Sequence, residues 1–592
     1  MTVGKRLWRA GLALALFLAL AFVVVAPPEH CPPVSAEQLR ESSQAAVDWF
    51  VRNQETDGAW LYLYDTDDDS VPEEEYNEVR HAGVTMGLYQ AAAAGLPGAL
   101  RSADRGTEWA LDRLVRGDGW AALEGDGRVT TGASALLAAG LVIRRDATGD
   151  TRYDDVLREL GRFLVDQTEP SGAVLASYDT ARGAPVPDEY SKYYTGEAYW
   201  ALGRLHLAFP GEDWGEAADR IGAYLATSRD DVEGHWPPIP DHWAAYGAAE
   251  TVEFPERGRP PLTDDELSYA RDQSELFGAQ ARWLAHYHGP WGRIVRGGYE
   301  PRGGWYGVVG EALTGWWLTA RADPRLDDLR APLGERATCI AGLAIEEQSD
   351  AEDAANAAQP DRVEGAWFTD GETRMDDQQH ALAGLLRTIP IVEAGEGGPS
   401  DAGENVPSVW LWAAVLLLAL NPARAAFGVP RAGDSPRTAA GLAAAGGLIG
   451  GLAVCAAAAV ADPLLDALDV SEPSFRTAAG IVAVIAGITD LFRRPPSPEP
   501  ALAGRRAALV PVAIPLVARP ALLVLALGAG ADRDVLLTAG AMALGIALLT
   551  GLTAARTPEG PRGRALRWAA RLLGAGLVAC GVLLTIDGVL DV

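Results

Sequence analysis

Apolar residues recur at helical spacing, three or four positions apart, along most of the segment between residues 35 and 393. More charged helical stretches, such as 108–117 and 155–168, lie between the apolar ones, and turns rich in glycine, proline and aspartate connect them. The most apolar stretches are 82–95, 131–145, 194–209, 273–287, 309–322 and 376–389. Such an alternation is typical of the inner and outer helices of an α/α toroid, so the pattern predicts an all-α fold.

A degenerate repeat lies within this segment, because residues 54–90 return in altered form as residues 167–204. Each copy contains, in the same order, a glutamine, a glycine, a Tyr-Asp-Thr triplet, a Val-Pro pair, a Glu-Tyr pair and an apolar helical run. The offset of about 114 residues suits two helical hairpins. We therefore expect equivalent residues of the two copies to point into one cavity.

Two other regions are apolar enough to enter a membrane. Residues 1–27 contain three cations followed by an apolar run from 10 to 26, which predicts a retained signal anchor. After a linker at 394–407, apolar segments follow near 408–421, 438–461, 475–492, 507–530, 535–555 and 568–590. Arginines cluster after the first, third and fifth segments, and acidic residues after the second and fourth. The positive-inside rule then predicts a multi-pass plasma-membrane protein with residues 28–406 outside the cytoplasm.

Charge is distributed unevenly along the chain, whose formal net charge is −30. Residues 28–406 contain 32 basic and 68 acidic residues, so the acidity belongs to the predicted toroid. A negative field repels nucleic acids and polyanionic glycans, which leaves the membrane and a neutral or cationic envelope glycan as expected partners. Solubility alone is an alternative explanation of this charge.

Four cysteines give little information about the compartment. Cys455 and Cys580 lie in the apolar segments near the C-terminus. Cys31 and Cys339 could form a disulfide in an oxidising compartment, but two separate thiols are the interpretation favoured by the sequence.

Three motifs in the predicted toroid resemble a known group of proteins. They are the turn Gln54-x3-Gly58-x-Trp60, the segment EYNEVRHAG at 75–83, and GAWFTDG at 365–371 with MDDQQHALAGLL at 375–386. These motifs resemble the six-hairpin glycosidase group and are similar to the squalene-cyclase side of the toroid folds. The resemblance implies a toroid of paired helices, and it does not specify an activity.

The six C-terminal apolar segments resemble the MarC family of integral membrane proteins. The similar stretches are Leu420-Asn421-Pro422, residues 470–481 and residues 510–520. Prolines interrupt the first segment of each three-segment half. Because three spans end on the opposite side of the membrane from where they begin, the two halves are predicted to have inverted topology. The resemblance implies a transporter-like domain of undefined substrate.

Acidic residues near the starts of inner helices are the candidate catalytic groups. Two carboxylates across a cavity, roughly 5–10 Å apart, can act as acid and base on a glycosidic bond. The alternative is that each carboxylate caps a helix. The catalytic candidates are Glu75, Glu189, Glu197, Asp376 and Asp377.

Aromatic, cationic and acidic side chains at matching points are the candidate substrate-binding groups, because aromatic faces stack on sugar rings. A tryptophan at helical spacing is, alternatively, a core residue. The binding candidates are Trp60, Arg80, His81, Tyr194, Trp305 and Glu311.

The interrupted segments near the C-terminus predict a polar site within the membrane. Arg519 stands where the MarC-like pattern has glycine, and an arginine in a span is costly unless it is paired or wetted. Asp490 is its expected partner. The candidate membrane-site residues are Asn421, Pro422, Asp490, Pro515 and Arg519.

Other motifs carry weaker hypotheses. Asp65-Thr66-Asp67-Asp68 matches the acidic motif of squalene–hopene-type cyclases, but it lies on a crossover loop, so a cyclase is a distant third hypothesis. The sequence has no P-loop, GxGxxG motif or nucleophile elbow, and we expect no cofactor and no metal site. The main hypothesis is a toroid that binds or hydrolyses glycan, and its alternative is a non-catalytic binding module.

Overall fold

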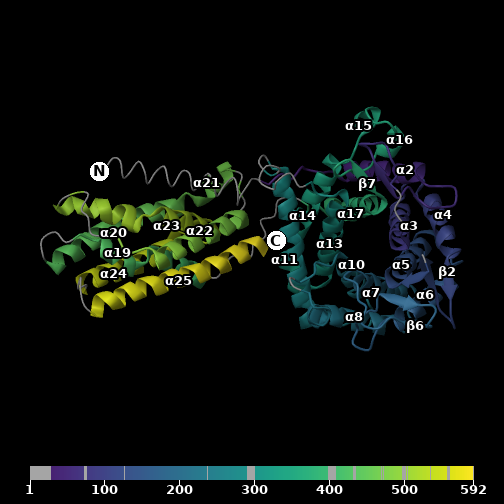
Figure 1. Cartoon of the computed structure of the whole chain (residues 1–592), viewed down its shortest axis with the longest axis horizontal. Coiled ribbons are helices and arrows are strands. Elements are labelled where there is room, and N and C mark those ends of the chain that lie inside the picture. The colour runs from purple at the N-terminus through teal and green to yellow at the C-terminus, as the bar shows by residue number, and fades with distance from the viewer. Residues whose placement is uncertain are drawn as a thin grey trace. The chain divides into compact units, whose positions relative to one another are not determined.

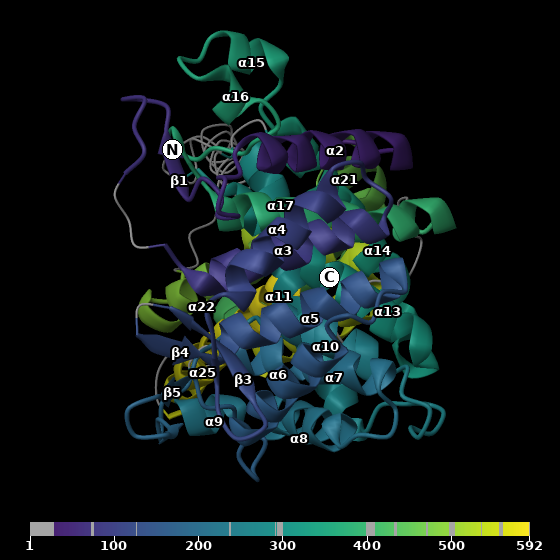
Figure 2. The same ribbon diagram turned by 90° about the vertical axis from the view of Figure 1, so that its right-hand side faces the viewer.

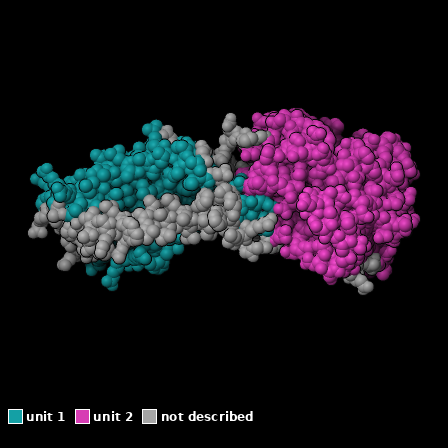
Figure 3. Space-filling model, turned by 90° about the horizontal axis from the view of Figure 1, so that it is seen from above, with its two compact units in different colours: residues 1–29, 286–297, 403–591 teal, residues 30–285, 298–402, 592 magenta. Residues whose placement is uncertain are grey.

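The structure is a computed structural model that describes residues 29–72, 76–125, 127–235, 238–289, 292, 300–397, 409–430, 435–468, 470, 472–496, 502, 504–533, 535–555 and 561–590. Contacts divide the chain into two compact units (Figure 3). The toroid unit comprises residues 30–285 and 298–402. The apolar-helix unit comprises residues 1–29, 286–297 and 403–591.

A closed ring of six helices forms the centre of the described toroid unit. Its members are α3 (Glu78–Ala93), α5 (Thr131–Thr148), α7 (Tyr194–Ala208), α10 (His242–Thr251), α13 (Gly303–Ala322) and α17 (Met375–Ala394). Each helix packs against the next one, and α17 packs against α3 to close the ring (Figures 1 and 2). These inner helices are buried on nearly every face, which explains why their sequences are apolar or small throughout rather than on one stripe.

An outer helix precedes each inner one. The outer helices are α2 (Ala36–Arg52), α4 (Ala99–Leu111), α6 (Asp154–Asp166), α8 (Trp214–Thr227), α11 (Asp264–His288) and α14 (Asp327–Glu346). In α6, for example, Leu157, Leu160, Phe163 and Leu164 face the core while the other side is charged. The predicted all-α toroid is therefore confirmed, with α2/α3, α4/α5, α6/α7, α8/α10, α11/α13 and α14/α17 as its hairpins.

One predicted ring position is wrong. The apolar stretch 273–287 belongs to α11, and α10, which the sequence pattern did not single out, lies between α7 and α13 in the inner ring. The helix α10 has only 10 residues, so it offers too few turns for a clear helical periodicity.

Short strands and helices connect the hairpins. Strand β1 (Leu63–Asp65) pairs with β7 (Glu372–Arg374), and β2 (Leu114–Arg116), β3 (Ala121–Gly125), β4 (Arg128–Thr130), β5 (Ser177–Asp179) and β6 (Ala184–Pro185) form an antiparallel sheet. The repeated Tyr-Asp-Thr triplets thus lie in β1 and β5, each ahead of an inner helix. The remaining short helices are α9 (Arg229–Glu233), η1 (Pro324–Leu326), α15 (Ala351–Ala355) and α16 (Pro360–Val363).

The repeated glutamine–glycine turn holds one helical hairpin against the next. Gly58 and Gly172 have positive φ angles of 103° and 93°, and a Cβ atom on either would lie within 2.5 Å of a carbonyl oxygen of the next outer helix, Arg105 or Arg220. Gly365 repeats this arrangement with φ of 85° against the carbonyl of Ala45 in α2. The turn therefore occurs three times, and each copy sets one hairpin against the next.

A disulfide joins Cys31 to Cys339 of α14, with Cα atoms 4.6 Å apart. The interpretation that these cysteines are separate thiols is therefore wrong. The two cysteines are 308 residues apart, and the closed ring brings the segment before α2 beside α14.

The apolar-helix unit contains the helices expected of a membrane domain. They are α18 (Val409–Leu420), α19 (Pro422–Gly428), α20 (Pro436–Ala459), α21 (Ala461–Leu468), α22 (Glu472–Phe492), η2 (Gly504–Ala508), η3 (Leu509–Val517), α23 (Pro520–Asp532), α24 (Val535–Ala555) and α25 (Pro561–Leu590). Among described residues, 5 helices are long and apolar enough to cross a membrane, and 6 if the bent pair 504–517 and 520–532 is one span. The predicted anchor at 10–26 lies outside the described residues.

We expect Gly172→Ala to lower the stability of the protein by about 1–3 kcal/mol or more, because it combines positive-φ strain with a clash against the carbonyl of Arg220. Gly149→Ala is the matched control, since Gly149 has φ of 71° but nothing within 4 Å of an added Cβ atom. Thermal unfolding of both variants in detergent measures the difference. Equal losses of stability in the two variants would show that the close approach of Gly172 to the carbonyl of Arg220 does not contribute to the effect.

Candidate active site

A cavity of about 600 Å³ lies where the N-terminal ends of the inner helices converge. Each inner helix contributes side chains from its first two turns, so residues distant in sequence meet there. Polar and charged lining residues are Asn77, Arg80, Tyr193, Tyr194, Glu197, His242, Gln280, Arg302, Arg374, Asp376, Asp377, Gln379 and His380, and the aromatic ones include Trp243, Phe277 and Trp305. The predicted convergence of inner-helix starts on one cavity is thus confirmed, and its size suits a ligand of one or two sugar rings.

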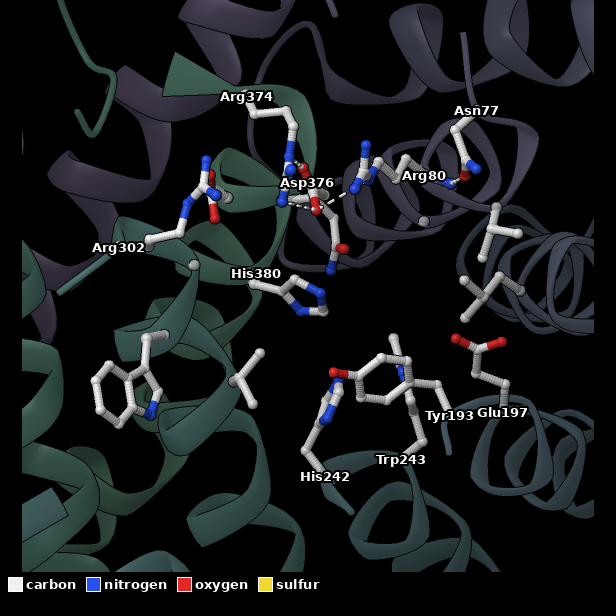
Figure 4. A pocket seen from close by; sticks show the side chains of 18 of the residues that line it. Asn77, Arg80, Tyr193, Glu197, His242, Trp243, Arg302, Arg374, Asp376 and His380 are labelled. Carbon is white, nitrogen blue, oxygen red and sulfur yellow. Dashed lines mark hydrogen bonds and ion pairs between the residues drawn. The ribbon is translucent and has the colours of Figure 1, made fainter. Parts of the chain in front are cut away.

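Two histidines face one another on one side of this cavity (Figure 4). His242 begins α10 and His380 lies in the second turn of α17, with ring centroids 5.2 Å apart. His380 Nδ1 lies 2.7 Å from Oε2 of Glu311, which is fully buried on α13. Tyr246 of α10 donates a hydrogen bond of 2.7 Å to Oε1 of the same carboxylate. The tyrosine and His380 together satisfy both oxygens of a buried acid.

The surroundings push the two histidines toward opposite protonation states. Burial would lower the pKa of His380, but the charge and hydrogen bond of Glu311 outweigh it and raise that pKa. Burial, followed by the charge of His380, holds the pKa of His242 well below its usual value. His380 therefore favours the imidazolium form and His242 the neutral form. Among the described residues, Nε2 of His242 has no hydrogen-bond partner.

An arginine–aspartate network lies next to His380. Arg374 donates to both oxygens of Asp376 at 2.5 and 3.0 Å, and Arg80 Nε lies 3.1 Å from Oδ2. Burial opposes ionisation, but the hydrogen bonds of Arg374 and the charge of Arg80 hold the pKa of Asp376 below its usual value. Burial and the charge of Asp376 raise the pKa of Asp377, which is ion-paired to Arg302 at 3.3 Å. Asp376 is consequently a fixed anion that orients two arginines.

Glu197 is the remaining acid in the cavity wall. It is 3% exposed, and burial, with a smaller effect of Asp241, raises its pKa to about 8. Its Oε2 has no hydrogen-bond partner among the described residues. Glu197 is therefore protonated at neutral pH and could donate a proton to a ligand. Next to it, burial and the charge of Glu197 raise the pKa of Tyr194 to about 12.

Glycines bring α13 and α17 close enough for the histidine–glutamate contact. A Cβ atom on Gly307 would lie 2.0 Å from the carbonyl carbon of His380, and one on Gly304 would lie 2.5 Å from Oδ1 of Asp377. A Cβ atom on Gly384 would lie 3.0 Å from the Cα of Gly307. No larger residue fits this glycine seam without moving one helix, and such a shift would separate His380 from Glu311.

Several predicted site residues lie elsewhere. Trp60 and His81, predicted to bind substrate, are core residues and do not line the cavity. His81 is fully buried between Tyr76 Oη and the carbonyl of Gly106, both 2.8 Å away, and burial lowers its pKa to about 3. Glu189 does not line the cavity but is ion-paired to Arg128.

The other candidates lie in or behind the cavity wall. Arg80, Tyr194, Glu197, Trp305, Asp376 and Asp377 line it, and Glu311 lies behind it. Glu75 lies outside the described residues. Four further residues line the cavity that the sequence pattern did not indicate: His242, Trp243, Arg302 and Arg374. The available signal for His242 was its place directly after Asp241, whose side chain caps the start of an apolar, alanine-rich helix.

The histidine cluster also raises the question of a metal ion. The donor atoms of His242, Glu311 and His380 lie within 4.8 Å of one another, a set that the sequence analysis did not anticipate. A His–Glu–His set suits zinc. Both oxygens of Glu311, however, are engaged by Tyr246 and His380. We therefore interpret the cluster as a hydrogen-bonded ion pair rather than a metal centre.

The apolar-helix unit contains the predicted polar cluster. Asp490, 2% exposed, accepts hydrogen bonds from Arg519 at 3.0 and 3.1 Å and from Asn421 at 3.0 Å, and pairs with Arg424 at 3.1 Å. The expected pairing of Arg519 with Asp490 is confirmed. Asn421 and Arg519 each stand before a proline that begins a helix, Pro422 or Pro520, so the cluster joins the two interrupted segments.

Pro515, the remaining predicted member of the membrane site, lies on the second interrupted segment, and a second charged pair that was not predicted lies elsewhere in this unit. Pro515 follows a cis peptide bond within η3. A separate fully buried ion pair joins Arg476 to Asp532, which also accepts a hydrogen bond from Trp412. Both clusters satisfy buried charges with partners from different helices.

No protein-family model matches the sequence, and no curated protein matches it. Similar solved structures include cellobiose 2-epimerase from Bacillus thermoamylovorans, with 12% identity, a TM-score of 0.43 and coverage of 60% of this chain and 98% of that chain. Cellobiose 2-epimerase from Spirochaeta thermophila has 15% identity, a TM-score of 0.42 and coverage of 61% and 98%. A GH76 α-mannanase from Bacteroides thetaiotaomicron has 10% identity, a TM-score of 0.41 and coverage of 60% and 96%. At these values the similarity carries no argument about activity.

We expect Glu311→Gln to lower the pKa of His380, because it removes the negative charge that raises it. Diethyl pyrocarbonate acylates only neutral imidazole, so the midpoint of His380 acylation against pH, read by mass spectrometry, should move to lower pH. Glu346→Gln is the control, since Glu346 pairs with His30 at the protein surface. An unchanged midpoint in Glu311→Gln would show that Glu311 does not set the charge of His380.

Asp490→Asn should destabilise the protein by about 3–5 kcal/mol, because it leaves Arg424 and Arg519 without their common counter-ion. Thermal unfolding in detergent measures the loss, with the exposed Asp462→Asn as control. The double variant Asp490→Asn/Arg519→Gln should lose less than the sum of the two single changes. Strict additivity would contradict a direct ion pair.

Proposed function

We propose that the toroid unit is an acid–base enzyme that moves a proton on a reducing sugar, at the carbon next to the carbonyl group. The observation that supports it most is the facing pair of His242 and His380, whose surroundings favour opposite protonation states. Pairs of titratable groups with pKa values pushed apart are typical of acid–base catalysis. The mixture of hydrogen-bonding groups and indole rings in a cavity of about 600 Å³ suits a sugar.

The proposed proton transfer uses the ring nitrogens of His242 and His380. Neutral His242 takes the proton from the carbon next to the carbonyl, while Nε2–H of His380 donates a proton to the carbonyl oxygen, which gives an enediol. If the enediol turns its opposite face to His242, return of the proton to the same carbon inverts that carbon, while His380 takes back the proton of the former carbonyl oxygen and the carbonyl forms again. Return of the proton from His242 to the former carbonyl carbon, while His380 takes the proton of the neighbouring hydroxyl, gives the isomer. In both cases each histidine regains its starting state. Glu311 stabilises the imidazolium, and the Arg80–Asp376–Arg374 network offers fixed donors to sugar hydroxyls.

Glycoside hydrolysis is the second candidate, and Glu197 is the observation that favours it. A carboxylic acid with a pKa of about 8 and an unpartnered oxygen has the properties of a general acid. Its counterpart would be Asp376 or Asp377, but both are engaged by arginines. That engagement makes hydrolysis the weaker of the two candidates. A toroid that binds glycan without chemistry is the remaining alternative.

We further propose that the apolar-helix unit holds the protein in the plasma membrane with the toroid unit outside the cytoplasm, beside neutral or cationic envelope glycans. The alternating arginine-rich and acidic connections support this orientation, and the Cys31–Cys339 disulfide fits an oxidising compartment. The two proline-interrupted segments that meet at Asp490 support a MarC-like, transporter-like role for this unit.

The enzymatic proposal predicts that the protein exchanges the proton next to the carbonyl of a reducing mono- or disaccharide with solvent. Incubation of the full chain with a sugar panel in D2O, followed by NMR, should show deuterium at that carbon. His242→Gln and His380→Gln should slow exchange by about a hundredfold or more, because each removes one proton-transfer group. Glu346→Gln serves as the surface control.

Three results would oppose this proposal or the roles it gives to its residues. No exchange with any sugar of the panel would remove it. Release of new reducing ends from oligosaccharides, lost in Glu197→Gln but retained in His242→Gln, would instead support hydrolysis. Loss of exchange on addition of a chelator would show that the histidine cluster holds a metal ion.

A further inference from the structure

A second cavity, of about 520 Å³, lies at the other end of the same ring. Five of the inner helices that start at the first cavity, α3, α5, α7, α13 and α17, also line the second, with residues nearer their C-terminal ends. Small or apolar exposed residues, such as Ala94, Ala147 and Pro390, belong to its lining, as do the polar residues Gln90, Asp146, Arg204 and Arg387. The two cavities share no lining residue.

The two arginines of this second cavity differ in their partners. Arg204 is neutralised by Glu250 and Asp146, each 2.8 Å away. Arg387 forms no ion pair with any carboxylate of the described residues; its Nε donates to Thr314 Oγ1 at 3.1 Å, and its Nη2 has no partner there. It lies two turns before the end of α17, so it does not cap the last carbonyl groups of that helix. A half-buried cation without a counter-ion is costly, and a ligand anion would remove that cost.

The guanidinium group of Arg387 is also held in place. Its Cζ atom lies 3.8 Å from the ring centroid of Tyr246, a stacked position that fixes the plane of the group. Because Nε is engaged by Thr314 and Nη2 is buried, Nη1 is the donor that Arg387 offers to an oxyanion in the cavity. Gln90 of α3 also contacts this tyrosine, with its Nε2 atom 3.4 Å from Tyr246 Oη. Its Oε1 atom has no hydrogen-bond partner among the described residues.

We propose that this second cavity binds a small ligand that carries a carboxylate group on an apolar body. The carboxylate pairs with Arg387, and the apolar body lies against Ala94, Ala147, Leu318 and Pro390. The ligand differs from the sugar of the first cavity both in charge and in its apolar part. The binding site stands independently of the proposed function.

A chain of contacts links this site to the first cavity. Arg387 stacks on Tyr246, Tyr246 donates to Glu311, and Glu311 holds His380. The other charged or titratable groups around His380 are His242, Asp376 and Asp377. A carboxylate bound to Arg387 cancels a positive charge behind this chain, so His380 should accept a proton more readily when the ligand is bound.

Isothermal titration calorimetry of the full chain in detergent tests the site, with hexanoate as the probe and hexanamide as its neutral counterpart. We expect binding of hexanoate and none of hexanamide. Arg387→Gln should weaken hexanoate at least about tenfold, because a hydrogen bond to a charged group is lost. The matched control is Arg321→Gln, which removes an exposed arginine that stacks on Trp317 but does not line the cavity.

Inorganic phosphate is a further probe in the same calorimetric titration. Binding of phosphate as tight as that of hexanoate would show an oxyanion site without a role for the apolar walls, and would overturn the carboxylate assignment. Equal affinity for hexanoate and hexanamide, or an unchanged affinity in Arg387→Gln, would overturn the site itself.

The coupling between the Arg387 site and His380 can be measured without any enzymatic activity. Saturating hexanoate should move the pH midpoint of His380 acylation upward in the wild type and leave it in place in Arg387→Gln. Binding without this shift would retain the site and overturn the coupling. Failure of sugar exchange in the first cavity would not affect either result, so the two proposals fail separately.

Discussion

The close approach of α13 and α17 is the constraint on which the candidate site depends. Gly304, Gly307 and Gly384 let the two backbones pack without side chains between them. Only at this separation does His380 reach Glu311. A buried carboxylate without partners would be unstable, so the tyrosine and histidine that engage Glu311 are as much a condition of folding as of chemistry. The glycine seam therefore fixes both the helix packing and the charge of the histidine.

Ring closure places the chemistry at one end of the toroid. All inner helices begin there, so their first turns bring acids, arginines, histidines and aromatic rings into one cavity although their sequence positions range from Asn77 to His380. The unsatisfied N–H groups and positive dipole ends of these helices favour negative charge at that end. The anionic Asp376 fits this field, and its two arginines limit how much negative charge remains for the cavity.

The sequence predicted the toroid because its apolar stretches and its repeat follow from backbone packing, which every hairpin must satisfy. It predicted the cavity acids for the same reason. The missing inner helix α10 was too short to show a period, and His242 was missed with it. His81 is a core residue although Arg80 lines the cavity, because adjacent helix positions point about 100° apart: Arg80 faces the cavity while His81 faces the outer layer. Trp60 lies in the turn before β1, and its ring packs against Gly106 of α4. The disulfide could not be predicted, since only ring closure brings Cys31 to Cys339.

The charge pattern of the two cavities indicates how one helix can serve both. In α17, His380 belongs to the first cavity and Arg387, two turns later, to the second, with Tyr246 of α10 and Glu311 of α13 between them. These three helices are neighbours in the ring, so a shift of α17 along its glycine contacts with α13 would alter the His380–Glu311 distance and the Arg387–Tyr246 stack together. Packed interfaces of this kind resist small deformations and instead change between discrete arrangements. The glycines that allow the His380–Glu311 contact are thus also the place where a ligand at the far end of the ring would act on it.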